Sequence, residues 1–290
     1  MFCFPLILSI SSPETAAYVS YLSRLLLHER LPHHLRVLDL CTGTGCIPLL
    51  FHHELHATRP ELDTTPEFVG VDISATAINL ANENRATYAL SARPAVGTIT
   101  FLDADVLATE SSLPAAISPD LTTALDTHHS SGTYGRPNYD ILISNPPYIS
   151  PRAFRRTTAR SVQHFEPALA LVPPASQQDQ ATRIANTNPL EPETTDPGDT
   201  FYPHLLSHAA TLNTQIALLE VADMSQALRV AAMAVRQGIW ERVEIWRDEP
   251  ARSSLGREVL GGREIVVRGE GDGRSVFLVR GRGCGWVGGL

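Results

Sequence analysis

The feature that most constrains the fold is a short apolar run that ends in a glycine-containing loop and continues as a helix. Residues 37–40 read Val-Leu-Asp-Leu, which is typical of a buried strand, and residues 41–45 read Cys-Thr-Gly-Thr-Gly. A helix is expected over residues 46–55, where Pro48 is tolerated because it falls in the first turn. A strand, a glycine loop and a helix in this order predict the first unit of a parallel sheet that helices cover.

Strand and helix patterns alternate along the rest of the chain. We expect strands and helices at the following positions: strands at 68–72, 99–102, 140–144, 215–221 and 242–246, a final strand hairpin from 264–267 and 275–279, and helices at 13–31, 74–85 and 225–236. Alternation of this kind predicts an α/β fold with a mainly parallel, Rossmann-like sheet and helices on both faces.

The composition fits one globular domain, and its charge argues against a protein that gains its affinity from nucleic-acid phosphates. The chain has 290 residues, of which 43% are hydrophobic and 19% charged, and its net charge is -8. Proteins that bind nucleic-acid phosphates usually carry a strongly basic domain. We expect a helical lead-in (1–35), a main domain (36–280) with surface insertions at 108–138 and 173–200, and a flexible, glycine-rich tail (281–290).

Neither a membrane segment nor a metal site is expected. Residues 1–10 are apolar, but they are too few to cross a bilayer and lack the basic residues of a signal peptide. The four cysteines form no C-x-x-C pair and are expected to be reduced thiols. Histidine doublets such as His128-His129 have no acidic or cysteine partner at ligand spacing in the sequence, so we assign them no metal.

Acidic residues stand at the ends of three consecutive predicted strands. In an open parallel sheet, ligands bind beyond the carboxyl ends of the strands. Asp39 is placed to accept hydrogen bonds from a cationic amino group, and Asp72 from the two hydroxyls of a ribose. Asp105 is placed to accept from the exocyclic amine of adenine, with Asp103 as the competing choice. These positions predict a nucleoside-type cofactor at this edge.

Other interpretations of the same residues stay open at this point. Gly43 and Gly45 allow a positive φ and a close approach of a ligand, but a tight structural turn would also use them. A nicotinamide dinucleotide is the rival ligand, although its fingerprint requires a third glycine where Pro48 stands. For Asp72 and Asp105 the alternative role is a helix cap or a solvated loop acid.

The tetrapeptide Asn145-Pro146-Pro147-Tyr148 directly follows the predicted strand at 140–144 and is the most informative motif of the chain. Its two prolines fix the backbone and offer no N–H group. The Asn145 side-chain oxygen and the Pro146 carbonyl can accept the two N–H groups of a planar, weakly nucleophilic nitrogen, and Tyr148 can form a flat wall over it. The motif therefore predicts a site that positions such a nitrogen for methylation; a rigid turn with a capping asparagine is the alternative.

Taken together, these motifs resemble the HemK/PrmC family of release-factor glutamine methyltransferases. The resemblance spans about residues 12–280. Besides the glycine loop and the tetrapeptide it includes four shorter segments, which are Ser-Pro-Glu-Thr at 12–15, Phe-Glu-Pro-Ala-Leu-Ala-Leu at 165–171, Gly-Asp-Thr-Phe-Tyr at 198–202 and Leu-Glu-Val at 219–221. The Glu-Pro-x-Leu-Ala-Leu match distinguishes this family from DNA adenine methyltransferases that share the tetrapeptide.

The resemblance implies a class I methyltransferase fold with seven strands, the last antiparallel, and S-adenosyl-L-methionine as the methyl donor. It implies that the chain methylates the glutamine side-chain amide in the Gly-Gly-Gln motif of a peptide chain release factor. The cofactor-binding residues would be Asp39, Cys41, Thr42, Gly43, Thr44, Gly45, Asp72, Asp105 and Asn145, and the catalytic residues Asn145, Pro146, Pro147 and Tyr148. The alternatives are a nucleic-acid methyltransferase that acts on an adenine or guanine amine and a non-catalytic homologue that binds the cofactor.

Partner and location follow from the same resemblance. We expect a monomer whose partner is a release factor, with no membrane contact and without nucleic acid as direct substrate. The insertions and the amino-acid sequence of the glycine loop are most similar to those of fungal mitochondrial members, so the mitochondrion is expected, with the cytoplasm as the alternative.

The chain departs from the family pattern at three places. Cys41 replaces the first glycine of the loop, and Ser12 stands where the family has arginine. The family's N-terminal helical domain, which grips the release factor, is not found upstream of Ser12, which implies either a truncated gene model or a different mode of docking. Four arginines that follow the tetrapeptide either steer a partner by charge or form a solvated face, namely Arg152, Arg155, Arg156 and Arg160.

Overall fold

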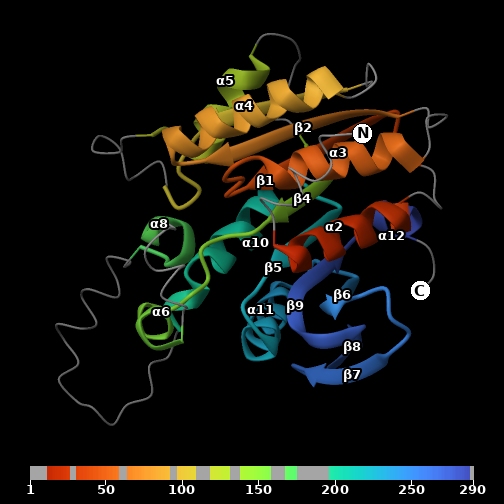
Figure 1. Ribbon diagram of the computed structural model, residues 1–290. Coiled ribbons are helices and arrows are strands. Elements are labelled where there is room, and N and C mark those ends of the chain that lie inside the picture. Colours follow the sequence, from red (N-terminus) through yellow and green to blue (C-terminus); the bar gives the residue numbers. More distant parts are fainter. Residues whose placement is uncertain are drawn as a thin grey trace.

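The computed structural model describes residues 12–26, 31–58, 64–91, 97–108, 118–130, 138–157, 167–174 and 196–287. Within these residues one nine-stranded sheet runs through the molecule in the order β3-β2-β1-β4-β5-β9-β6-β8-β7 (Figure 1). The strands are β1 (His34–Leu40), β2 (Thr65–Asp72), β3 (Thr98–Asp103), β4 (Ile141–Ser144), β5 (Ile216–Glu220), β6 (Arg242–Glu249), β7 (Leu255–Leu260), β8 (Arg263–Arg268) and β9 (Glu270–Val279).

Helices connect and cover these strands. They are α2 (Pro13–Leu26), α3 (Cys46–Thr58), α4 (Ala75–Ser91), α5 (Leu121–His129), α6 (Pro151–Thr157), α8 (Ala168–Leu171), the 3-10 helix η2 (Pro197–Asp199), α10 (Phe201–Thr211), α11 (Met224–Gln237) and α12 (Gly283–Trp286). No helix in the described part of the chain combines the length and apolar character that a membrane span requires.

The parallel, Rossmann-like sheet that the alternation predicts is confirmed. Strands β1 to β5 pair in parallel, and β9 lies antiparallel between β5 and β6, so the antiparallel last strand is also confirmed. The chain runs outward from β1 to β3 and then returns to place β4 on the other side of β1. The order therefore reverses between β1 and β4, which is where ligands of such sheets bind.

The predicted number of strands and the predicted final hairpin are wrong. Nine strands are present among the described residues rather than seven, because β7 and β8 extend the sheet beyond β6. The hairpin partner of β8 is β7, while β9 inserts between β5 and β6. Strand β7 escaped prediction because nearly all of its side chains are exposed and show no apolar alternation. The signal that marks it is Gly261-Gly262, whose positive φ values of 56° and 79° suit a two-residue hairpin turn.

Two apolar layers cover the faces of the sheet, as expected from the twofold alternation of side chains along a strand. Leu38 and Leu40 of β1 face the layer that includes α5, α10 and α11. Leu35 and Val37 face the opposite layer, where α2 and α3 pack against each other (Figure 1). The strands of this central part are therefore buried on both sides.

Two segments that were predicted to be surface insertion or flexible tail contain packed structure. The C-terminal region forms α12, and Trp286 and Val287 are buried in the layer that holds α2 and α3. The flexible tail is thus wrong for residues 281–287, because two apolar side chains after a glycine-rich run are enough to anchor it. Helix α5 lies inside the predicted insertion 108–138, whereas most of the insertion 173–200 is outside the described residues.

Candidate functional site

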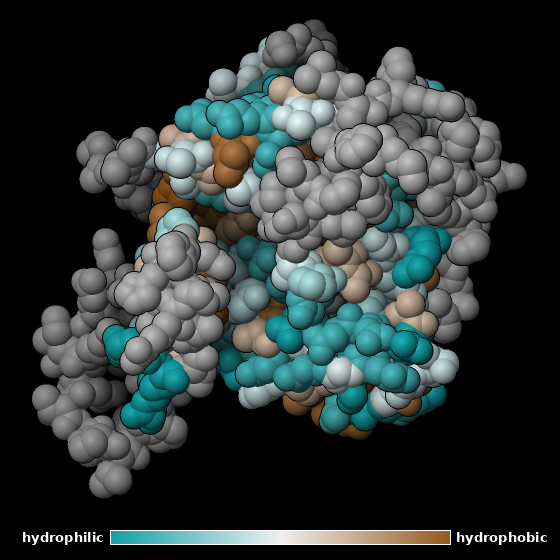
Figure 2. Space-filling view, in the orientation of Figure 1, coloured by the Kyte–Doolittle hydropathy of each residue, from teal (hydrophilic) through white to brown (hydrophobic). Residues whose placement is uncertain are grey.

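The predicted site residues lie along the carboxyl edge of the parallel strands. The pairing register places Leu40 of β1 between Val71 of β2 and Ser144 of β4, so the segments that follow these strands begin side by side. The paired ends of β2 and β3 are Asp72 and Asp103. Figure 2 shows that the surface is hollowed on this side, between the part that carries α4 and β2 and the part that carries α6 and α8.

The glycine loop after β1 is held by backbone hydrogen bonds, and its two glycines have different functions. The Thr42 N–H donates to the Val71 carbonyl (2.9 Å), and both Gly43 and Gly45 have positive φ, of 55° and 77°. A Cβ at Gly45 would lie 2.5 Å from the Phe101 ring, whereas a Cβ at Gly43 would meet no atom within 4 Å. Gly45 is therefore required by packing and backbone conformation, and Gly43 borders open space.

Cys41 occupies the first position of this loop in a left-handed conformation. Its φ of 61° is one of two positive values at non-glycine residues in the described part of the chain, the other being that of Asn213. Asparagine tolerates this region, but for cysteine the Cβ comes too close to the following carbonyl. The residue that departs from the family pattern thus stands where glycine is favoured.

Asp39 is the buried acid of the site. Its Oδ2 accepts a hydrogen bond from the Thr42 hydroxyl (2.5 Å), while its Oδ1 is buried and has no partner among the described residues. Burial raises the pKa of Asp39 to about 8, against the lowering effect of the Thr42 hydrogen bond and with a smaller increase from the charge of Asp72. An unpartnered buried acceptor is costly, so this oxygen favours a cationic donor as its partner.

Asp72 and Asp105 both act as local caps in the structure. Asp72 accepts from the Gly43 N–H (2.8 Å) through one oxygen and from the Ser74 N–H (2.9 Å) through the other. Asp105 accepts from the Leu107 N–H (2.8 Å) and is half-buried, whereas the competing Asp103 is exposed. Capping does not exclude a ligand, because each carboxylate oxygen can accept a second hydrogen bond. Their ribose and adenine contacts stay predictions.

Asn145 emerges from β4 at the same edge. It is half-buried, and Pro146 and Pro147 behind it are buried. Ser144 is fixed to the neighbouring strand because its hydroxyl donates to the Leu40 carbonyl (2.7 Å). Within the part of the chain that the structure describes, no hydrogen bond is made by the Asn145 side chain. Its amide is thus held by a rigid backbone and remains available to a ligand.

Tyr148, the last residue of the tetrapeptide, is anchored through a buried carboxylate that sequence reasoning missed. The Tyr148 hydroxyl donates to Glu220 Oε1 (3.2 Å) at the end of β5. Glu220 Oε2 accepts from the hydroxyls of Thr15 (2.7 Å) and Tyr18 (2.5 Å) on α2. Burial raises the pKa of Glu220, although the hydroxyl donors oppose this effect. We call Thr15, Tyr18, Tyr148 and Glu220 the carboxylate network.

A second set of contacts holds the backbone of the same corner. Gln226 Nε2 lies 3.4 Å from the Tyr148 carbonyl and 3.1 Å from the Gly198 carbonyl. A Cβ at Gly198 would lie 2.5 Å from the Tyr148 carbonyl oxygen, so this glycine is required by close approach. The Ile149 N–H donates to the Leu171 carbonyl at the end of α8 (2.9 Å). Segments from all four shorter motifs, 12–15, 165–171, 198–202 and 219–221, therefore contribute to one corner.

The arginines after the tetrapeptide are exposed on α6. This holds for Arg152, Arg155 and Arg156, and Arg160 lies outside the described residues. The steering of a partner by these charges stays a prediction. Glu220 could have been selected from the sequence, because it lies in the Leu-Glu-Val segment and, like Asp39, is an acid at the end of an apolar strand, whereas Gln226 has no such signal.

The chain is similar in sequence to several curated glutamine methyltransferases. The chain is 32% identical over 162 residues to the mitochondrial MRF1 N(5)-glutamine methyltransferase MTQ1 of Saccharomyces cerevisiae, covering 55% of this chain and 41% of the yeast protein. It is 33% identical over 138 residues to the release factor glutamine methyltransferase of Chlorobaculum tepidum, covering 48% of this chain and 35% of that protein. A ribosomal protein uL3 glutamine methyltransferase of Bordetella pertussis is 28% identical, with 53% and 39% covered.

The matched region has limits. The chain spans about 35 to 41% of the length of these relatives, and no family model matches it. Among solved structures, a putative class I S-adenosylmethionine-dependent methyltransferase from Listeria monocytogenes is 14% identical with a TM-score of 0.47, covering 93% of this chain and 60% of that one. Within these limits, the curated relatives that the chain resembles are named as glutamine methyltransferases, which is the kind of protein that the motifs indicated.

Proposed function

We propose that this chain transfers a methyl group from S-adenosyl-L-methionine to the side-chain amide nitrogen of the glutamine in the Gly-Gly-Gln motif of a peptide chain release factor. The observation that carries the proposal is the arrangement of two groups at one edge of the sheet. One is the available amide of Asn145 on its anchored corner, and the other is the buried, unpartnered Oδ1 of Asp39.

The residues present fit the proposed cofactor. Asp39 Oδ1 would accept from the α-ammonium group, the open space beside Gly43 would take the ligand backbone, and Asp72 would accept from the ribose. Asp105 would accept from adenine, as the strand-end pattern indicates. When bound, the cofactor supplies a methyl group on a sulfonium, which needs no metal and no covalent enzyme intermediate.

The tetrapeptide supplies orientation rather than a strong base. An amide nitrogen has a delocalised lone pair, so it reacts only when it is held in line with the methyl group. The Asn145 side-chain oxygen and the Pro146 carbonyl would each accept one N–H of the glutamine amide, and the Tyr148 ring would pack on its plane. Such positioning can lower the activation free energy by up to about 7 to 11 kcal/mol. The nitrogen releases one proton to solvent as the new N–C bond forms.

The substrate and location are proposed from the names of the relatives. Two of these are named as mitochondrial MRF1 N(5)-glutamine methyltransferases, from Saccharomyces cerevisiae and, at 35% identity over 140 residues, Schizosaccharomyces pombe. We therefore propose a mitochondrial release factor as the partner. Because other relatives are named for ribosomal protein uL3, this protein is the second candidate, and it offers the same glutamine amide chemistry.

The test is methylation with a cofactor that carries a radioactive methyl group. Purified chain is incubated separately with a release factor, with the same factor carrying glutamine-to-alanine in Gly-Gly-Gln, with uL3 and with total RNA. Label in the release factor that disappears in the alanine version supports the proposal. Label in uL3 alone transfers the assignment to the second candidate, and label in RNA alone refutes glutamine as the target.

Cofactor binding is measured in parallel, so that inactivity has a defined meaning. Calorimetry with S-adenosylhomocysteine should show one site per chain. Binding without label transfer to any substrate would favour the non-catalytic homologue, and the absence of binding would remove both enzyme interpretations.

A further inference from the structure

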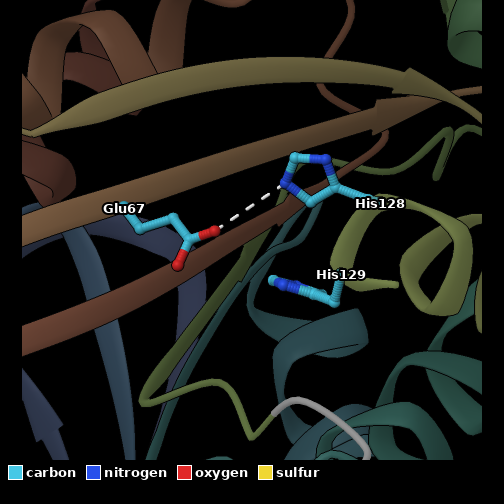
Figure 3. Close-up of side chains that lie close together, drawn as sticks. All are labelled: Glu67, His128 and His129. Atoms are coloured by element: carbon cyan, nitrogen blue, oxygen red, sulfur yellow. Dashed lines mark ion pairs between the residues drawn. The ribbon is translucent and has the colours of Figure 1, made fainter. Parts of the chain in front are cut away.

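We propose that Glu67, His128 and His129 form a zinc site (Figure 3). One ligand atom from each side chain lies within 4.8 Å of the other two. Two imidazoles and a carboxylate are a ligand set that zinc takes in sites with three protein ligands and a water in the fourth position. In the described part of the chain, this is the group in which three such side chains meet. It corrects the sequence analysis, which found no acidic partner for the histidine doublet.

The helix explains how two neighbouring histidines face the sheet together. Helix α5 begins after Asp120, whose side chain accepts from the Thr123 N–H (3.0 Å), and it buries Leu121 and Leu125. Positions 128 and 129 continue that face, since residues at i, i+4 and i+7 or i+8 lie on one side of a helix. Both rings are therefore directed to β2 from the last turn, where the helix carbonyls also favour a cation.

The strand supplies the third ligand from the facing side. Glu67 precedes Val69 and Val71 by two and four residues, and both valines belong to the apolar layer that includes α5. The alternation of β2 thus places the Glu67 carboxylate on the side of the sheet that faces α5, and Figure 3 shows it directed toward His128. Its side chain is 29% exposed and that of His128 is 23% exposed, so both ligands are partly buried.

The separations fit a metal ion better than a hydrogen bond. Glu67 Oε1 lies 3.7 Å from His128 Nε2, which is the separation of an ion pair with a protonated histidine (dashed line in Figure 3) and too long for a hydrogen bond. Around a tetrahedral zinc, with bonds of about 2.0 to 2.2 Å, neighbouring ligand atoms are about 3.4 Å apart. The ligand atoms, which lie within 4.8 Å of one another, would therefore have to move closer together when the ion binds.

The surrounding groups orient the ligands. Arg36 lies opposite Glu67 in the register of β1 and β2, and its Nε donates to Glu67 Oε2 (3.1 Å). This leaves Oε1 as the single oxygen that faces His128. The Tyr139 hydroxyl lies 3.0 Å from His129 Nε2 and fixes that ring. Hydrogen-bonded carboxylates and imidazoles of this kind are the usual surroundings of metal ligands.

The position of the site indicates what bound zinc would do. Glu67 precedes Asp72 by five residues on β2, which corresponds to about 16 Å along the strand, so the ion is outside the proposed methyl-transfer site. It would join α5, which lies within the insertion 108–138, to the central sheet. Because the three ligands meet only in the folded chain, zinc would stabilise that state.

The test uses the full chain, stripped with a chelator and titrated with Zn²⁺ against a chromophoric competitor. We expect one zinc per chain, and at a hundredfold excess over its Kd a rise in Tm of about 5 °C. Mg²⁺ should cause no such rise, because it prefers oxygen ligands. Cobalt(II) should give the visible absorption of a four-coordinate site. The absence of bound zinc in the unmodified chain overturns the proposal.

Matched variants separate the site from adventitious binding by surface histidines. His128→Ala and Glu67→Gln should each weaken zinc binding at least 100-fold, while their Tm in chelator stays near that of the parent chain. His34→Ala is the control, because His33 and His34 form a second doublet, with ring centroids 4.6 Å apart in an edge-to-face contact, that belongs to no three-ligand group in the described residues. An equal loss of zinc in His34→Ala and His128→Ala would overturn the proposal.

Discussion

The two halves of the candidate site differ in how their polar groups are satisfied. In the glycine-loop half, Asp39 Oδ1 is buried without a partner and Gly43 borders open space. In the tetrapeptide half, Tyr148 is held at both ends, through its hydroxyl by Glu220 and through its carbonyl by Gln226. Asp39 Oδ1 therefore gains a partner only when a ligand arrives, whereas the corner at Tyr148 is already organised without one.

This difference separates binding from turnover. A ligand that satisfies the Asp39 carboxylate removes a cost that the folded chain otherwise bears, so the glycine-loop half should govern cofactor affinity. The corner at Tyr148 is already held by Glu220 and Gln226, so under the proposed function it should govern the orientation of the substrate nitrogen and hence the rate of transfer. Substitutions in the two halves should consequently affect different quantities.

The largest effect is expected from Asn145→Ala, which removes one proposed acceptor of the substrate amide from the preorganised half. Turnover on a Gly-Gly-Gln protein should fall at least about 100-fold, equivalent to about 2.7 kcal/mol of transition-state stabilisation. The Kd for S-adenosylhomocysteine should change by less than about threefold. Single-turnover kinetics and calorimetry measure the two quantities, and unchanged turnover would refute the role of Asn145.

The next effect concerns what holds the corner in place. Glu220→Ala leaves the buried hydroxyls of Thr15 and Tyr18, and that of Tyr148, without their acceptor. We expect a loss of about 2.5 kcal/mol in the free energy of unfolding, together with a lower kcat, because the tetrapeptide loses its anchor. Denaturant unfolding and steady-state kinetics provide the measurements.

Two milder variants serve as controls for the carboxylate network. Glu220→Gln keeps a side-chain oxygen and should lose less stability than Glu220→Ala, while Tyr148→Phe removes only the bond of 3.2 Å. If Glu220→Ala unfolds at the same denaturant concentration as the parent chain, the network does not stabilise the corner.

The same contrast explains which parts of the site could be predicted from the sequence. Asp39, Gly43 and Gly45 lie within one strand and its loop, so local pattern rules reach them. Glu220, by contrast, accepts hydrogen bonds from Tyr148 and Thr15, which lie 72 and 205 positions away in the chain. Gly198 is required because it closely approaches the Tyr148 carbonyl, fifty residues earlier. Such contacts depend on the order of strands, which local periodicity does not determine. The exposed edge strand β7 was missed because it lacks apolar alternation.

A smaller effect is expected in the ligand-dependent half. Asp39→Asn keeps the shape of the side chain but removes the charge, so cofactor affinity should fall about 20-fold, or about 1.8 kcal/mol. Because the pKa of Asp39 is about 8, its carboxyl is mainly protonated at pH 7 before the ligand binds. Pairing with the ammonium group requires the carboxylate, so binding should release a proton that Asp39→Asn does not release. Calorimetry in two buffers of different ionisation enthalpy measures this release.

The raised pKa of Asp39 also predicts the direction in which the stability of the ligand-free chain changes with pH. Between about pH 3.8 and 8 the folded carboxyl holds a proton that the unfolded one has lost, so its contribution to stability falls as the pH rises through this window. Asp39→Asn should remove that part of the pH dependence. Equal slopes in the two chains, or equal proton release, would mean that Asp39 is ionised before binding.

The smallest effect is expected from Cys41→Gly, which tests whether the glycine-loop half carries backbone strain. A left-handed conformation costs a residue with a Cβ about 1 to 2 kcal/mol, and the greater freedom of glycine in the unfolded chain offsets about 0.5 to 1 of this. Cys41 also packs against the core layer that faces α5, which reduces the benefit further. We therefore expect a net gain of about 0.5 kcal/mol in the free energy of unfolding.

Asn213→Gly is the matched control, since Asn213 has a similar φ of 53° but asparagine tolerates this conformation, and its effect should be smaller. A less stable Cys41→Gly chain would show that the packing of the thiol outweighs the conformational cost.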